Sequence, residues 1–141
     1  MLRPALILTA VAAAMISSPA ATLAARAPSA GTYRGATAEG RAITLTVAAG
    51  RVTRVDVAVV NYACDLEGDI GPLAVKGAPR ARIGAAGRFG GSSGPTSERM
   101  RIDGRFGRGA RVRGSLRLRG TVGTGEPCSS PRIRFSARRV G

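Results

Sequence analysis

The sequence predicts an all-β domain, a small antiparallel β-barrel of about six to eight strands, with a two-sheet β-sandwich as the alternative. Three observations predict this fold class. Apolar and polar residues alternate with a period of two in most segments after Gly31. All 20 glycines lie beyond residue 30, where they separate these segments as turns do. No segment keeps a helical apolar period long enough to cover a sheet.

Residues 1–25 have the pattern of a helical secretory signal peptide. Arg3 provides the positive start, and an apolar run follows it over residues 5–15. The run ends at Ser17-Ser18-Pro19 and is shorter than the roughly 20 residues that a transmembrane helix needs. Small residues then favour cleavage near Ala24 or Ala25. We therefore expect a secreted, extracytoplasmic protein with no membrane span after processing. Its predicted parts are the signal peptide 1–25, a short flexible lead 26–30 and a single β domain 31–141.

The first half of the β domain contains the strongest hairpin pattern. Residues 42–48 and 52–60 each place three apolar side chains on one face, and Ala49-Gly50-Arg51 between them indicates a tight turn. The apolar side chains are Ile43, Leu45, Val47, Val55, Val57 and Val59. Shorter strands are expected at 31–36, 73–75, 81–83 and 88–89. Loops are expected at 61–72 and 90–95.

The last third returns to regular alternation, at 99–106, 111–119 and 132–139. Side chains alternate across a strand, so apolar residues share one face of each segment and arginines occupy the other. We call these arginines the arginine face: Arg99, Arg101, Arg105, Arg111, Arg113, Arg117, Arg119, Arg132, Arg134 and Arg138. Because a guanidinium group binds phosphate or carboxylate through a planar fork, this face is a candidate polyanion-binding surface.

The charge balance also points to anionic partners. The chain has 22 basic and eight acidic residues, and removal of Arg3 with the signal peptide lowers the formal net charge from +14 to +13. The alternative is that GC-rich codons account for the arginines and that the face is simply solvated. Phe89, Phe106 and Phe135 share the parity of the expected core, so they are not placed to stack on bases. This argues against specific nucleic-acid recognition.

Cys64 and Cys128 are the only cysteines, so a single intramolecular disulfide is possible in an exported chain. In the loop-entropy model, a disulfide that closes a loop of this size stabilises the folded protein by roughly 4 kcal/mol. We therefore predict a Cys64–Cys128 disulfide.

Catalytic and metal-binding patterns are weak. The chain has no histidine, which removes the usual general base and the usual zinc ligand. Asp65, Glu67 and Asp69 alternate as at the start of a calcium loop, but no acidic residue follows before Glu98. These carboxylates are alternatively a solvated loop or a patch that pairs with the basic surface. We predict no enzyme activity, no metal and no cofactor.

Several segments together resemble a group of small exported β proteins from high-GC bacteria. The resemblance rests on GTYRGATAEGR from Gly31, IDGRF from Ile102, ARVRGSL from Ala110 and FSARR from Phe135, with the cysteines between them. It covers most of the β domain and fits least well over 65–98. The group has no established activity, so the resemblance supports only the fold and the disulfide.

The function that these patterns favour is an exported, non-catalytic binding or structural module. It would contact anionic envelope or extracellular polymers through the arginine face. The first alternative is a barrel that carries a small apolar ligand, because Gly104, Gly114 and Ala137 on the inward face could leave room for one. A hydrolase is the second alternative. The sequence predicts no particular ligand or oligomeric state.

Overall fold

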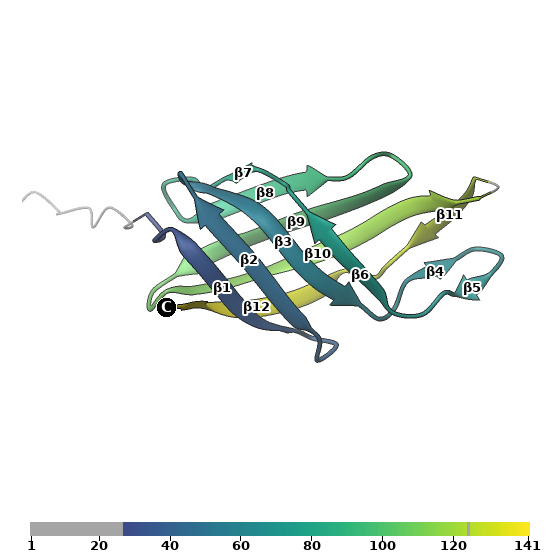
Figure 1. Cartoon of the computed structure of the whole chain (residues 1–141), viewed down its shortest axis with the longest axis horizontal. Coiled ribbons are helices and arrows are strands. Elements are labelled where there is room, and N and C mark those ends of the chain that lie inside the picture. Colours follow the sequence, from purple (N-terminus) through teal and green to yellow (C-terminus); the bar gives the residue numbers. More distant parts are fainter. Residues whose placement is uncertain (1–26, 124) are drawn as a thin grey trace, which may run out of the picture.

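The computed structural model describes residues 27–123 and 125–141, which form one antiparallel sheet of twelve strands (Figure 1). The strands are β1 (Gly31–Thr37), β2 (Ala42–Ala48), β3 (Arg51–Val59), β4 (Ala63–Cys64), β5 (Gly68–Asp69), β6 (Leu73–Gly77), β7 (Ala81–Arg82), β8 (Arg88–Ser93), β9 (Glu98–Gly107), β10 (Arg111–Val122), β11 (Glu126–Ser129) and β12 (Ile133–Val140). The all-β prediction is confirmed. The predicted signal peptide lies outside the described residues, and none of the described residues belongs to a helix that is long and apolar enough to cross a membrane.

The sheet folds over itself into two layers whose strands cross at an angle (Figure 1). One layer contains β1, β2, β3 and β6, and the other contains β8, β9, β10, β11 and β12. The ladder between β1 and β12 joins the layers along one side. Within the described residues, the folded sheet thus encloses its apolar faces without a helix.

The prediction of a closed barrel is wrong. On the side opposite the β1–β12 ladder, β7 pairs with β3 and β8 pairs with β9, and no ladder joins β7 to β8 in the described chain. β7 has only two residues and leads at once into a turn in which Gly87 donates to the Gly84 carbonyl. Pro79, just before β7, has no N–H to offer a neighbouring strand. The seam is closed by packing instead, since Gly91 of β8 lies against Pro79 and Ala81.

The strand count exceeds the expected six to eight because the loop predictions were partly wrong. Residues 61–72 contain the two-residue strands β4 and β5, and residues 90–93 continue β8 along β9. The sequence pattern also missed β11, which pairs with the end of β10. Such short strands, and a strand of glycine and serine, carry no apolar alternation by which a period of two is recognised.

The inward-facing residues pack into a single core. The predicted inward side chains of β2, β3, β9, β10 and β12 are buried, as are Tyr33, Val52, Tyr62 and Phe89. Gly104 and Gly114 lie opposite each other on β9 and β10. A Cβ atom on Gly104 would come within 2.7 Å of the Phe89 ring, and one on Gly114 within 2.7 Å of the Phe135 ring. Two aromatic rings therefore fill the space that these glycines leave. The carrier hypothesis, in contrast, requires this space to be open for a ligand.

Candidate anion-binding face

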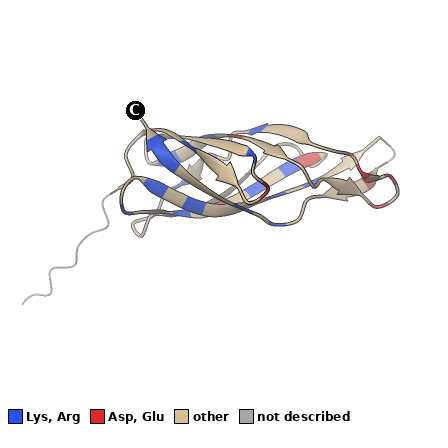
Figure 2. Cartoon of the chain, turned by 90° about the horizontal axis from the view of Figure 1, so that it is seen from below, with Lys and Arg blue, Asp and Glu red and all other residues tan. Residues whose placement is uncertain are grey.

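The ten arginines of the arginine face are all exposed and lie on the outer surface of the β8–β12 layer. Figure 2 shows Lys and Arg as blue bands along the strands. The ladders place eight of the ten arginines opposite one another in four pairs: Arg99 with Arg119, Arg101 with Arg117, Arg105 with Arg113, and Arg111 with Arg138. The ladders also add two arginines to this surface that the sequence pattern did not single out, Arg88 opposite Arg105 and Arg34 opposite Arg138. Only the register, which no single strand reveals, brings these two into the face.

Cross-strand arginine pairs work against folding. Residues directly opposite each other on neighbouring strands begin about 5 Å apart, and like charges at this separation repel. Asp103 is the only carboxylate among the described residues at outward positions of these strands. The face therefore has a large excess of positive charge, which an anion bound between the strands would neutralise.

Asp103 is already engaged by neighbouring side chains. An Arg132 terminal nitrogen lies 3.0 Å from its Oδ2, and the Ser115 hydroxyl donates to the same carboxylate at 3.2 Å. Arg132 Nε also donates to Ser115 Oγ at 2.7 Å. This network explains why Ser115 is buried although it points outward. It neutralises one arginine, Arg132, and leaves the cross-strand pairs without a carboxylate.

The surface of the face is hollowed in two adjoining places. The first hollow, of about 470 Å³, lies over β9 and β10 and is lined by Ser92, Arg99, Arg101, Asp103, Ser115, Leu116, Arg117, Arg119 and Arg132. The second, of about 470 Å³, extends toward β11 and is lined by Asp65, Thr96, Arg99, Arg117, Arg119, Gly120, Pro127, Cys128 and Ser129. Three arginines are common to both: Arg99, Arg117 and Arg119. Positive charge therefore surrounds the concave part of the face.

A hydrogen bond to the segment between β11 and β12 holds the Arg117 side chain in place. Its Nε donates to the Ser130 carbonyl at 3.2 Å, which leaves its two terminal nitrogens for a ligand. Ser130 is itself fixed, because its hydroxyl accepts from Leu118 N at 2.9 Å and donates to the Pro131 carbonyl at 2.8 Å. Ser130 N donates to the Leu118 carbonyl as well. This segment between β11 and β12 thereby orients one guanidinium group of the hollow.

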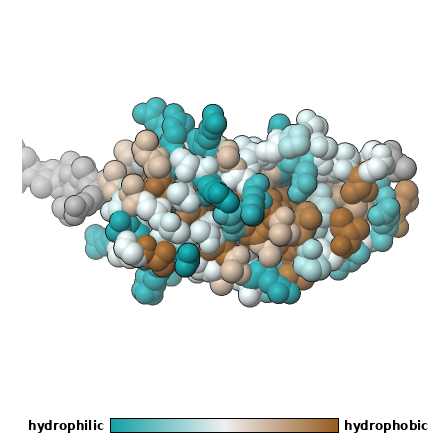
Figure 3. Space-filling view, in the orientation of Figure 1, coloured by the Kyte–Doolittle hydropathy of each residue, from teal (hydrophilic) through white to brown (hydrophobic). Residues whose placement is uncertain are grey.

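The carboxylates predicted as a possible calcium loop lie on and beside the β4–β5 hairpin, at the end of the molecule (red, right, in Figure 2). Asp65, Glu67 and Asp69 are exposed, and Asp69 accepts from Gly71 N at 2.9 Å. Within residues 27–123 and 125–141, no three His, Cys, Asp or Glu side chains form a group that could hold a metal ion. The hairpin also exposes Leu66 (88%) and Ile70 (41%), and hydrophobic residues extend toward this end in Figure 3.

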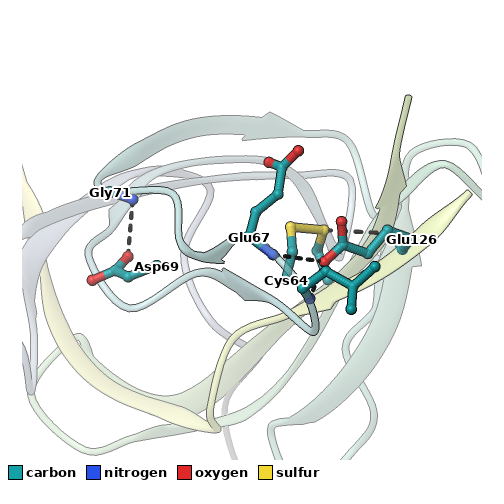
Figure 4. The surroundings of a disulfide bond; sticks show 7 residues. Cys64, Glu67, Asp69, Gly71 and Glu126 are labelled. Atoms are coloured by element: carbon teal, nitrogen blue, oxygen red, sulfur yellow. Dashed lines mark hydrogen bonds between the residues drawn. A yellow bond between two sulfur atoms is a disulfide. The ribbon is translucent and has the colours of Figure 1, made fainter. Parts of the chain in front are cut away.

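The predicted disulfide is confirmed and ties this hairpin to the sheet. Cys64 and Cys128 lie opposite each other on β4 and β11 with their sulfur atoms 2.00 Å apart. Figure 4 shows the carboxylate of Glu126 beside them, where it accepts from the backbone amides of Leu66 and Glu67. Glu126 is buried, and its carboxylate accepts the hydrogen bonds of the backbone amides in the turn of the hairpin. This acidic residue therefore does not neutralise the arginines of the face.

Comparison with known proteins adds no family to this description. No family model matches the chain, and no curated protein matches it significantly. The resemblance to small exported β proteins therefore stays a prediction, and the arginine face is the feature of this chain that bears on its function.

Proposed function

We propose that this protein is an exported, non-catalytic module that binds anionic envelope or extracellular polymers through the arginine face. The observation that carries the proposal is the register of β9, β10 and β12, which sets arginine opposite arginine in four rows, with the row of Asp103 and Ser115 between the second and the third. A polymer with regularly spaced negative charges would lie across these rows and bridge each pair. The disulfide supports export, because such bonds are typical of oxidising compartments.

The proposal is for recognition of charge, not of bases. Phe89, Phe106 and Phe135 are buried, as the sequence predicts, so none of them offers a stacking surface. Binding through guanidinium groups alone depends on the release of counterions, and the logarithm of the affinity falls linearly with the logarithm of the salt concentration. Affinity should therefore follow the charge density of the polymer and be strongly sensitive to salt.

The test compares retention on heparin, an anionic cell-wall polymer and DNA as the salt concentration rises. The face variant replaces one arginine of each row: Arg101→Gln, Arg113→Gln, Arg119→Gln and Arg138→Gln. The matched control variant removes four positive charges outside the face: Arg41→Gln, Arg54→Gln, Lys76→Gln and Arg80→Gln. We expect the natural protein to stay bound above about 0.15 M salt, the physiological ionic strength. We expect the face variant to elute much earlier than the control variant.

Two results would contradict the proposal. One is elution of the natural protein at or below physiological salt from all three matrices. The other is an equal loss of retention in the two variants, which would show that net charge, wherever it lies, accounts for binding. Circular dichroism of each variant establishes that both retain the β fold before they are compared.

A further inference from the structure

We infer that the first hollow, over β9 and β10, is a discrete site for a compact ligand that carries two or more linked oxyanions. The inference rests on the proposed function, since it places one defined site within the arginine face. This site differs from the rest of the face, and its ligands are short chains of tetrahedral phosphate or sulfate groups.

The arginines of the hollow form two rows of two. Arg99 pairs with Arg119 in one row, and Arg101 pairs with Arg117 in the next. The members of a row begin about 5 Å apart, and the two rows are about 7 Å apart along the strands. Each row can receive one oxyanion between its two guanidinium groups. A ligand whose anionic groups are linked at the spacing of the rows satisfies both at once.

The remaining lining makes the hollow differ from the other rows. Ser130 fixes Arg117 through its carbonyl, and the Asp103–Ser115–Arg132 network closes the side of the hollow beyond the Arg101 row. Ser115 and Leu116, which precede Arg117 on β10, also line the hollow. The row of Arg111 and Arg138 lines neither hollow. A fixed guanidinium group costs less entropy on binding, so the hollow should bind more tightly than an open row.

A ligand whose anionic groups are linked should bind more tightly than the same groups unlinked. Once one group of the ligand is bound, the second binds at a high effective concentration, which can raise the overall affinity by on the order of 100-fold. Inorganic tripolyphosphate is the probe for linked phosphates, and orthophosphate at the same phosphorus concentration is its unlinked counterpart. A sulfated disaccharide tests whether linked sulfates on a sugar serve as well.

The experiment is isothermal titration of the full β domain with each probe at low ionic strength, in three proteins. The hollow variant, Arg101→Gln with Arg119→Gln, removes one arginine of each row. The control, Arg111→Gln with Arg138→Gln, removes the same charge from a row outside the hollow. All four guanidinium groups donate to no other described side chain or carbonyl, so neither variant removes an internal hydrogen bond. Both should fold.

We expect tripolyphosphate to bind at one site, on the order of 100-fold more tightly than orthophosphate, and to lose about 10-fold or more in the hollow variant but less than about 2-fold in the control. Tighter binding of the sulfated disaccharide than of tripolyphosphate would assign the site to sulfated sugars within the same class. Equal losses in both variants, or no saturable binding of either linked probe, would overturn the inference. The hollow variant and the Arg111–Arg138 control both lie within the arginine face. If both lose polymer retention equally, the proposed function still holds and only the discrete site is disproved, so the two failures are distinguishable.

Discussion

Arg101 and Arg117 lie directly opposite each other on β9 and β10, and both side chains are exposed. We predict that Arg101→Gln raises the free energy of unfolding by about 0.2–1 kcal/mol, because it removes one repulsive cross-strand pair and no hydrogen bond to a described residue. Urea unfolding at low salt measures the change. The gain should shrink at high salt, where exposed charges are screened.

Arg41→Gln is the control for this substitution, since Arg41 is an exposed arginine outside the face. It should leave the stability nearly unchanged. A loss of stability in Arg101→Gln, or a gain that persists at high salt, would mean that the pair does not repel through space as the register indicates.

The two tyrosines provide a pH-dependent readout of the core. Burial raises the pKa of Tyr33, against a smaller opposing effect of Arg139, and burial together with the Glu98 charge raises the pKa of Tyr62. The unfolded chain loses its phenolic protons near pH ~10. Above that pH the folded state binds more protons than the unfolded state, so stability falls as the pH rises from about 10 through the raised pKa values.

The measurement is the ultraviolet absorbance of tyrosinate against pH, in the native protein and in urea. Tyrosinate should form at higher pH in the native protein. Ionisation of both phenols at the same pH in the two conditions would show that neither ring is buried as described.

At the scale of the elements, hairpins with regular alternation could be predicted and short strands could not. The β2–β3 hairpin is confirmed, and two features of it agree: apolar side chains alternate with other residues on both strands, and Ala49 and Gly50 adopt the positive φ angles (48° and 68°) of a two-residue turn. Only residues 88–89 of β8 carried a strand pattern. Its Gly91 allows the close approach of Pro79 and Ala81, a requirement that arises only from the tertiary fold.

The candidate site divides in the same way. Outward arginines on β9, β10 and β12 follow from parity, which is a local property of each strand. Register determines which arginines lie opposite each other and brings Arg34 and Arg88 into the face. The hydrogen bond from Arg117 to Ser130 depends on the segment between β11 and β12. These depend on which strands become neighbours, and a single sequence does not specify that.

The disulfide determines the stability of the β4–β5 end. This hairpin has two strands of two residues each. Among the described residues it is joined to the sheet by the two-residue β4–β11 ladder, the Cys64–Cys128 bond, the Glu126 hydrogen bonds and the hydrogen bond from Asp65 N to the Pro127 carbonyl. We predict that Cys64→Ser with Cys128→Ser lowers the free energy of unfolding by about 4 kcal/mol. Urea unfolding of this variant, with the natural protein under reducing conditions alongside, measures the loss.

The control compares polymer retention in the same variant. The arginine rows lie on β9, β10 and β12, so retention at temperatures where the variant is folded should be nearly unchanged. An unchanged stability, or a variant that keeps its stability but loses retention, would contradict the assignment of a purely stabilising role to the disulfide.

At the scale of the whole molecule, charge is distributed unevenly between the parts of the fold. Outward positions of one layer carry arginines and a single carboxylate, Asp103, whereas Asp56 of the other layer has an ion pair with Arg54 and lies opposite Lys76. The remaining acidic residues gather toward loops and hairpin ends, where Glu39 and Glu126 accept hydrogen bonds from the backbone. Positive charge on the arginine face is thus not balanced within the described chain.

This distribution predicts how salt affects thermal stability. Raising the ionic strength from 0.01 M to 0.15 M shortens the Debye length from about 30 Å to about 8 Å, which weakens repulsion across and between the arginine rows. The melting temperature of the natural protein should therefore rise over this range. The face variant, which breaks all four repulsive pairs, should start from a higher melting temperature at low salt and rise much less. The matched control variant has the same net charge as the face variant and keeps all four arginine pairs. It loses the attraction of Arg54 and Lys76 to Asp56, which salt would otherwise weaken, so its rise should equal or exceed that of the natural protein. Equal salt responses in the two variants would show that repulsion depends on total charge alone, and the register of the arginines would then have no energetic consequence for an anion to relieve.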